Sequence, residues 1–256
     1  MIEIEQLVRY PLKSGVGINA TSLIGGASGI DGDREFCLYR KSDNTFISMR
    51  DNVRIADIAI FADGNRLAVK ISDEIKFFNI FGTEKNNIRI WSRCVDVTVM
   101  PPDVSAFISC FIGEEVVIAR LFHFGDYSQS FMDTGPIHII SLAALTSLSL
   151  ATGYENINPL VFRPNIIIPD FSDVAEEKVE TLTINGVRFA VTERTERCTA
   201  VSILHRKIHG LDSSALLEKV DEANDYDGAL FGLYLQAQDR FKLNVGDQIT
   251  IGRLSG

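Results

Sequence analysis

The chain lacks the features that mark several common protein classes. Its four cysteines, Cys37, Cys94, Cys110 and Cys198, are widely scattered and form no Cys-x-x-Cys pair. This spacing excludes a zinc finger and argues against a disulfide framework. No apolar run reaches the ~20 residues needed to span a bilayer, and the alternating acidic start, residues 1–5, is typical of a first strand rather than a signal peptide. We therefore expect a reduced, cytoplasmic protein with no membrane partner.

Positive charge and phosphate-binding loops are also scarce. The 25 Lys and Arg residues face 34 Asp and Glu residues, a formal net charge of -9, which argues against a nucleic-acid partner. There is no GxxxxGK[ST] loop and no GxGxxG fingerprint after a strand. None of the four histidines lies in a nucleophile-elbow context, so a Ser-His-Asp hydrolase is not indicated.

Short runs of β-forming residues dominate the first third of the chain. Between residues 1 and about 90, turns separate these runs at roughly 8–12-residue spacing, which favours a small antiparallel barrel or sandwich. From Trp91 onward, strands alternate with a few helices. The sequence predicts a mostly β, β-barrel-like fold with a few helices and two intertwined domains, an N-terminal barrel over residues 1–90 and a larger domain over 91–256. The first strand is expected to pack into the larger domain.

Capping signals mark the helices of the second part. A helix is expected from Val104 to Phe111, ending at Gly113, with Cys110 in the core beside its aromatic neighbours. Another helix is expected over residues 142–150, because Ser141 is a good N-cap and Gly153 a good C-terminal stop. Residues 213–220 predict a third.

A predicted hairpin leads to the most suggestive cysteine. Asn185-Gly186 separates two β-rich runs, and this pair is a strong signal for a two-residue type I′ turn. The second run continues through polar residues to Cys198, which follows Arg197 and lies near Arg194. Nearby positive charge favours the thiolate, the form that attacks electrophiles and binds soft metals. The alternative interpretation is a small apolar residue in a barrel wall.

Four polar clusters interrupt the apolar strands. They are Lys13-Ser14, Asp33-Arg34, residues 131–134 and Arg163-Pro164-Asn165. Structural interpretations exist for three of them: a solvated Lys13, a turn ion pair between Asp33 and Arg34, and an Asp133 that caps a turn. Together, the cations, hydroxyls and amide would suit an anionic, phosphate-bearing ligand.

These clusters occur as part of an ordered set that covers almost the whole chain. The set comprises Tyr10-Pro11-Leu12-Lys13-Ser14, Gly32-Asp33-Arg34, Phe131-Met132-Asp133, His138-Ile139-Ile140-Ser141, Phe162-Arg163-Pro164-Asn165, Arg197-Cys198, Phe231-Gly232-Leu233-Tyr234 and Val245-Gly246-Asp247. In this order the motifs resemble the MOSC family, the molybdenum cofactor sulfurase C-terminal domains, with the N-terminal β-barrel domain attached. Each motif alone is weak, whereas the ordered set is specific.

The resemblance implies a bound molybdenum-molybdopterin cofactor. By motif, Cys198 maps onto the cysteine that supplies a thiolate to molybdenum, and with Asp133 it is the implied catalytic residue. Asp133 and Thr134 match the segment near the metal. Residues matching pterin and phosphate contacts, or flanking the cysteine, are Lys13, Ser14, Arg34, Arg163, Asn165 and Arg197.

The implied activity is a two-electron reduction of a small N-hydroxylated or N-oxide substrate, with electrons from a separate electron-transfer protein. A second hypothesis is a non-catalytic carrier of the cofactor or of a persulfide on Cys198, and a third is a member that no longer binds the cofactor. Residues 201–210 are basic where many relatives carry an acidic segment. One interpretation is that the basic residues change the substrate or the surface that meets the electron donor. The other is that they form a solvated hairpin tip.

Overall fold

The computed structural model describes residues 1–81, 84–122, 129–172, 174–210 and 215–253. The chain forms two compact units that interleave along the sequence. Unit 1 comprises residues 1–9, 19–31 and 134–256, and unit 2 comprises residues 10–18 and 32–133. The N-terminal strand belongs to unit 1, the larger unit, as expected, and residue 90, where the domain boundary was placed, lies within unit 2.

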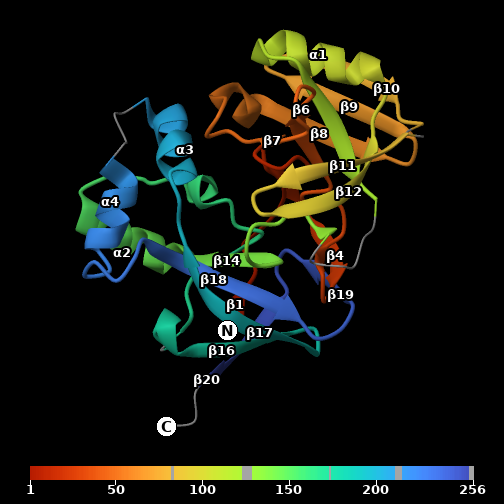
Figure 1. Cartoon of the computed structure of the whole chain (residues 1–256). Coiled ribbons are helices and arrows are strands. Elements are labelled where there is room, and N and C mark those ends of the chain that lie inside the picture. Colours follow the sequence, from red (N-terminus) through yellow and green to blue (C-terminus); the bar gives the residue numbers. More distant parts are fainter. Residues whose placement is uncertain (82–83, 123–128, 173, 211–214, 254–256) are drawn as a thin grey trace. The chain divides into compact units, whose positions relative to one another are not determined.

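Strands make up most of the regular structure of both units (Figure 1), which confirms the predicted mostly β fold with a few helices. Unit 1 contains a nine-stranded sheet in the order β1-β20-β16-β17-β18-β14-β15-β2-β3. Its strands are Ile2–Glu3 (β1), Gln6–Arg9 (β2), Ile18–Ala20 (β3), Ile137–Ser141 (β14), Ile166–Ile168 (β15), Val179–Ile184 (β16), Val187–Glu196 (β17), Leu230–Ala237 (β18) and Gln248–Arg253 (β20). A smaller sheet joins Phe241–Asn244 (β19), Ser22–Gly26 (β4) and Gly29–Ile30 (β5) in that order.

The predicted Asn-Gly hairpin is confirmed between β16 and β17. Ile184 pairs with Val187, so Asn185 and Gly186 are the two turn residues. Their φ angles of 51° and 78° are the positive values that a type I′ turn requires. The strand β17 then continues to Glu196, with register shifts in its pairing to β18 after Val191 and Arg194. The hairpin therefore delivers Arg197 and Cys198 at the end of a long strand.

The α-helices in the described part of unit 1 are Leu142–Thr152 (α2), Ala200–His209 (α3) and Ala215–Glu222 (α4). The α2 prediction is confirmed in detail, since the Ser141 hydroxyl accepts a bond from the Ala144 N–H at 3.1 Å and Gly153 ends the helix at φ 71°. The first two residues predicted for α4 lie outside the described residues.

The hairpin-tip interpretation of residues 201–210 is wrong, because they form most of α3. Its buried face carries Val201 and Leu204 at helical spacing, and Gly210 ends the helix with φ 64°. Burying one apolar stripe against the unit stabilises a helix over a solvated turn. The helix then closes with basic residues in its last turn, where the macrodipole favours positive charge.

The described residues of unit 2 form two sheets and one α-helix. The five-stranded sheet has the order β11-β12-β13-β6-β7, and the three-stranded sheet has the order β10-β9-β8. The strands are Phe36–Arg40 (β6), Phe46–Ile47 (β7), Ile58–Asp63 (β8), Arg66–Ile71 (β9), Glu74–Asn79 (β10), Glu84–Ile90 (β11), Arg93–Val99 (β12) and Val116–Leu121 (β13). The helix is α1, Pro102–Ile112, and short 3-10 turns occur at Val53–Asp57 (η1) in this unit and at Pro159–Phe162 (η3) and Glu176–Lys178 (η4) in unit 1.

Each unit has its own apolar core. The unit 1 core contains residues of both of its sheets, such as Ile166 and Phe189 of the larger sheet and Leu243 of the smaller one, which are all inaccessible to solvent. In unit 2, α1 buries Val104 and Ile108 in a core that includes residues of both sheets. Burying each such side chain contributes about 1.5–3 kcal/mol. Cys110 is exposed, so its predicted core position is wrong: the inward stripe of α1 passes through Val104, Ile108 and Ile112 instead.

Candidate functional site

Lys13 lies in a tightly constrained segment of unit 2. Its N–H donates to the Phe36 carbonyl at 2.8 Å, next to the parallel bridge between Leu12 and Phe36. Ser14 follows with φ 67°, a left-handed conformation that side chains other than glycine seldom adopt. A side chain at Gly15 would collide with the Ile58 carbonyl, so glycine is required there. The backbone thus determines where Lys13 enters the unit.

The Lys13 side chain is 6% exposed, so the solvated interpretation is wrong. Its ammonium donates to the Phe131 carbonyl at 2.8 Å and to Asp133 Oδ1 at 2.6 Å. Burial lowers the pKa of Lys13 below its ordinary value, and the attraction of Asp133 offsets only part of this effect. A buried amine of this kind is held in one place by its partners.

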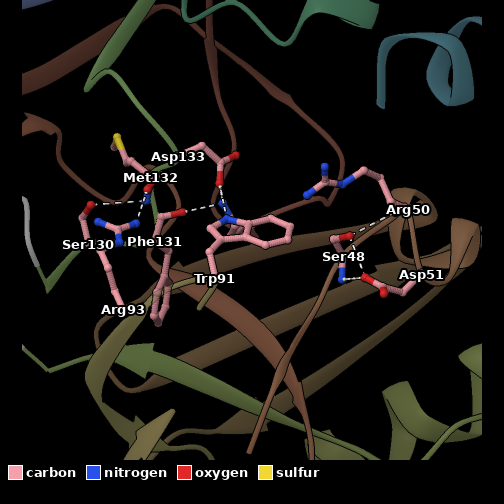
Figure 2. Close-up of polar contacts among 10 residues, drawn as sticks. Ser48, Arg50, Asp51, Trp91, Arg93, Ser130, Phe131, Met132 and Asp133 are labelled. Carbon is pink, nitrogen blue, oxygen red and sulfur yellow. Dashed lines mark hydrogen bonds and ion pairs between the residues drawn. The ribbon is translucent and has the colours of Figure 1, made fainter. Parts of the chain in front are cut away.

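Besides the bond from Lys13, Asp133 accepts one from Trp91, whose indole N–H donates to the same Oδ1 at 2.9 Å (Figure 2). Burial raises the pKa of the Asp133 carboxyl, but the Lys13 ammonium and the hydrogen bonds from Lys13 and Trp91 outweigh it and hold the pKa below the usual value. The carboxylate therefore stays ionised, and both of these donors bond to Oδ1 rather than Oδ2. Asp133 precedes β14 and acts as the counter-ion of Lys13 rather than as a turn cap.

Trp91 and its neighbours were not predicted as site residues. Trp91 and Ser92 form the two-residue turn between β11 and β12, and Trp91 has φ 54°. Arg50 places its guanidinium 4.4 Å from the indole centroid, and Phe46 packs edge-on at 5.6 Å. Arg93 donates to the Met132 carbonyl at 2.6 Å and thereby holds the segment before Asp133. We call Lys13, Phe46, Arg50, Trp91 and Asp133 the Lys13 cluster. The sequence offered one signal for it, a Trp at a turn position.

The predicted ion pair between Asp33 and Arg34 is confirmed, with Arg34 Nη1 bonded to Asp33 Oδ2. Asp33 is buried and accepts the Tyr10 N–H through Oδ1 at 2.6 Å. Arg34, at φ 48°, places its guanidinium 4.6 Å from the Tyr10 ring centroid. Its charge acts on both Lys13 and Asp133, because it contributes to the pKa shift of each. Unit 2 thus gathers Lys13, Arg34 and Asp133.

In unit 1, Cys198 is exposed at the junction between β17 and α3, so the barrel-wall interpretation is wrong. Its carbonyl accepts the Val201 N–H at 3.0 Å in the first turn of the helix. Arg197, just before it, is anchored twice: its N–H donates to the Ala229 carbonyl at 2.8 Å, and Nη2 donates to the Phe162 carbonyl at 2.7 Å. These bonds fix the backbone that presents the thiol. We call residues 197–199 the Cys198 segment.

Arg163 and Asn165 follow Phe162, the residue whose carbonyl accepts the Arg197 hydrogen bond. Arg163 ends η3 in a left-handed conformation, φ 53°, and is half-buried directly after Phe162. Asn165, just before β15, is 1% exposed, and its amide bonds to the strands on either side of β15: Nδ2 donates to the Val8 carbonyl at 3.1 Å and Oδ1 accepts the His138 N–H at 3.2 Å. The side chain of Asn165 therefore ties together β2 and β14, the two strands that flank β15. Thr134, at the start of the last segment of unit 1, is exposed.

The predicted site residues therefore form two groups. Lys13, Ser14, Arg34 and Asp133 belong to unit 2, and Thr134, Arg163, Asn165, Arg197 and Cys198 belong to unit 1. Within the described part of the chain, no group of three or more His, Cys, Asp or Glu side chains could hold a metal ion alone. Nor does any described helix have the length and apolar character to cross a membrane.

Comparisons with known proteins bear on both units. One relative is the mitochondrial amidoxime reducing component 2 of Rattus norvegicus, 26% identical over 132 residues. The match covers 48% of this chain and 39% of that protein, so the chain corresponds to well under two thirds of the relative. Among solved structures, the YuaD protein of Bacillus subtilis is similar over 97% of this chain and 94% of that one, with a TM-score of 0.51. At 12% identity, this similarity shows the fold alone.

Family models account for nearly the whole chain. The MOSC N-terminal beta barrel domain matches residues 1–115, and the MOSC domain matches residues 122–250. The second match alone covers half of the 256 residues and contains all five predicted site residues of unit 1. The chain belongs to the MOSC family.

Proposed function

We propose that this protein binds a molybdenum-molybdopterin cofactor and reduces small N-hydroxylated or N-oxide compounds, with electrons supplied by a separate electron-transfer protein. The observation that carries the proposal is the exposed Cys198 thiol, presented by a doubly anchored Arg197 at the start of α3. Family membership and the name of the rat relative support the same chemistry.

The donor set in this chain suits such a cofactor. A soft thiolate is a fitting protein ligand for a metal that the pterin already binds through sulfur. Negative charge beside Cys198 is favoured by the positive end of the α3 macrodipole. Arg163 and Arg197 in unit 1, and Lys13 and Arg34 in unit 2, are cations of the kind that bind phosphate oxygens. We propose each of these cations as a phosphate contact, and each can be tested by itself.

When bound, the cofactor would supply the two-electron chemistry of oxygen-atom removal. The chain would supply binding, charge and proton handling. Asp133 is kept ionised by Lys13 and Trp91, which both donate to Oδ1. We propose that Oδ2 accepts a hydrogen bond from the N–OH group of the substrate and so orients it. Because all four cysteines are free thiols, we further propose that the protein works in a reducing cytoplasm.

Cys198→Ser tests the proposal directly. Wild type and variant would be purified from a host that makes the cofactor, with molybdenum measured by mass spectrometry and pterin by fluorescence. We expect near-stoichiometric molybdenum in wild type and a loss of at least about tenfold in the variant, because serine oxygen is a harder and weaker donor than thiolate. Cys94→Ser, at another exposed cysteine, is the matched control and should retain the metal.

Two other outcomes would change the conclusion. If Cys198→Ser retains both metal and activity, Cys198 is not the ligand. If wild type binds the cofactor stoichiometrically but does not turn over a panel of N-hydroxylated substrates with a competent reductase partner, the protein is a carrier of the cofactor. An exposed thiol also suits that role, and a persulfide on Cys198 would then be sought by mass spectrometry.

A further inference from the structure

Arg50 lies in a locked turn of unit 2, immediately after β7. The Ser48 N–H and hydroxyl both donate to Asp51 Oδ2, at 2.9 and 2.7 Å. The Arg50 N–H donates to the Ser48 hydroxyl at 3.2 Å, and the Asn52 N–H donates to the Ser48 carbonyl at 3.0 Å. These bonds leave the backbone of residues 48–52 little freedom. The Arg50 side chain therefore starts from a fixed position, and Figure 2 shows it reaching toward Trp91.

Trp91 is equally well fixed. Its indole N–H is bound to Asp133, its ring packs edge-on against Phe46 at an interplanar angle of 75°, and the Arg50 guanidinium lies 4.4 Å from its centroid. The residue keeps φ at 54° and remains 49% exposed. A bulky residue held in a left-handed conformation is strained, and such strain gathers at ligand sites and is retained where the surroundings determine it.

The N–H groups of the Arg50 guanidinium are available to bind a ligand. Arg50 is exposed, and its guanidinium donates no hydrogen bond to any residue that the structure describes. The nearby carboxylate of Asp51 is already engaged by Ser48. Stacking on an indole holds a guanidinium flat and leaves its N–H edge available, and this edge matches the two oxygens of a carboxylate or phosphate.

We propose that Arg50, oriented by Trp91, binds an oxyanion group of a ligand beside Asp133. This inference rests on the proposed function, because it places a contact for the cofactor or the substrate next to the residue that would orient the N–OH group. The oxyanion has two possible sources, the phosphate of the cofactor and a carboxylate of the substrate. In this proposal Arg50 binds the anionic ligand, and Trp91 positions the Arg50 guanidinium by stacking against it.

The first experiment needs no cofactor. Trp91 is the only tryptophan of the chain, so tryptophan fluorescence, excited selectively over the six tyrosines, reports on this place alone. Inorganic phosphate and benzoate would be titrated into the full chain, free of cofactor, at constant ionic strength. We expect a saturable change in wild type whose midpoint rises at least about tenfold in Arg50→Gln, since charge-assisted hydrogen bonds are lost.

Arg66→Gln is the matched control. Arg66 is also an exposed arginine over an exposed aromatic ring in unit 2, 5.8 Å from the Phe77 centroid, and its loss changes net charge equally. Its midpoints should equal those of wild type. The proposal would be overturned by the absence of a saturable response in wild type, or by equal midpoints in wild type and Arg50→Gln.

The second experiment identifies the source of the oxyanion in protein from a cofactor-producing host. If the source is the cofactor, Arg50→Gln loses molybdenum and pterin. If it is the substrate, metal content is unchanged and KM rises for a carboxylate-bearing N-hydroxylated compound but not for a neutral one. Unchanged metal content and unchanged KM for both compounds would refute the inference. The titration without cofactor can succeed even if the proposed function fails, so the two failures are distinguishable.

Discussion

The Lys13 cluster and the Cys198 segment present chemistry in opposite ways. The Lys13 ammonium is buried and bonded to two oxygens, whereas the Cys198 thiol is exposed and its position depends on the backbone around it. A buried cation is tolerated only where its partners are in place, so its position belongs to the packing of unit 2. An exposed thiol adds little to stability. Changes in the first group should therefore affect folding, and changes in the second should affect ligand binding alone.

The largest effect on stability is expected from Lys13→Met. The variant removes the partner of Asp133 and of the Phe131 carbonyl, and we expect a loss of about 2–3 kcal/mol of unfolding free energy, below the range for a fully buried pair because Asp133 is 59% exposed. Urea unfolding measures it. Cys198→Ser should stay within about 0.5 kcal/mol of wild type.

Lys41→Met is the control for Lys13→Met. Lys41 pairs with Glu115 at 2.8 Å on the surface of the same unit, with both side chains mostly exposed. Its removal should leave unfolding unchanged. The comparison between the two groups fails if Cys198→Ser destabilises the protein as much as Lys13→Met does.

Asn165→Ala sharpens the comparison within unit 1. Removing the amide leaves the Val8 carbonyl and the His138 N–H without that partner in a buried place, at a cost of about 1–2 kcal/mol. Gln6→Ala on β2 removes only an exposed bond to Asn19 and should lie within about 0.5 kcal/mol of wild type. Metal content measured beside stability decides the role of Asn165. Loss of molybdenum without loss of stability would make it a ligand contact rather than a joint between strands.

The smallest effect is a pH dependence in α3, the helix that begins just after Cys198. His205 is 1% exposed, packs against Tyr154 and His209, and has its pKa lowered first by burial and then by the charge of His209. The unfolded chain, with a pKa near 6.5, then binds the proton more readily than the folded chain. The stability contribution is therefore complete above pH 6.5 and falls as pH drops below it, by at most about 1.4 kcal/mol per pH unit.

Urea unfolding at several pH values between 7 and 5 would measure this slope. His205→Phe keeps an aromatic ring against Tyr154 and should flatten the profile. His209→Gln should retain most of it, because burial is the larger cause of the shift. A slope in His205→Phe equal to that of wild type would assign the dependence to another group. Metal retention followed over the same pH range would show whether the Cys198 segment relies on α3.

Local patterns in the sequence were reliable where short-range chemistry decides the structure. The Asn-Gly hairpin, the Ser141 cap of α2 and the Gly113 end of α1 each depend on the φ preference or hydrogen bonding of one or two residues. The α3 helix was missed although Val201 and Leu204 have helical spacing, because a polar, basic stretch after a strand also suits a turn. Its buried stripe acquires meaning only against the rest of unit 1.

The sequence by itself determined the mostly β composition, the hairpin before Cys198 and the ordered motifs of the family. Only the tertiary structure decided which predicted residues bond to one another in a buried place and which are exposed to solvent. Lys13 and Asp133 are 120 residues apart in the chain yet 2.6 Å apart in space, and Asn165 reaches Val8 across 157 residues. Such pairings depend on how strands close the two units, which no local preference encodes. Burial then turned a seemingly solvated lysine into the centre of a cluster, because a charge taken out of water needs its partners nearby.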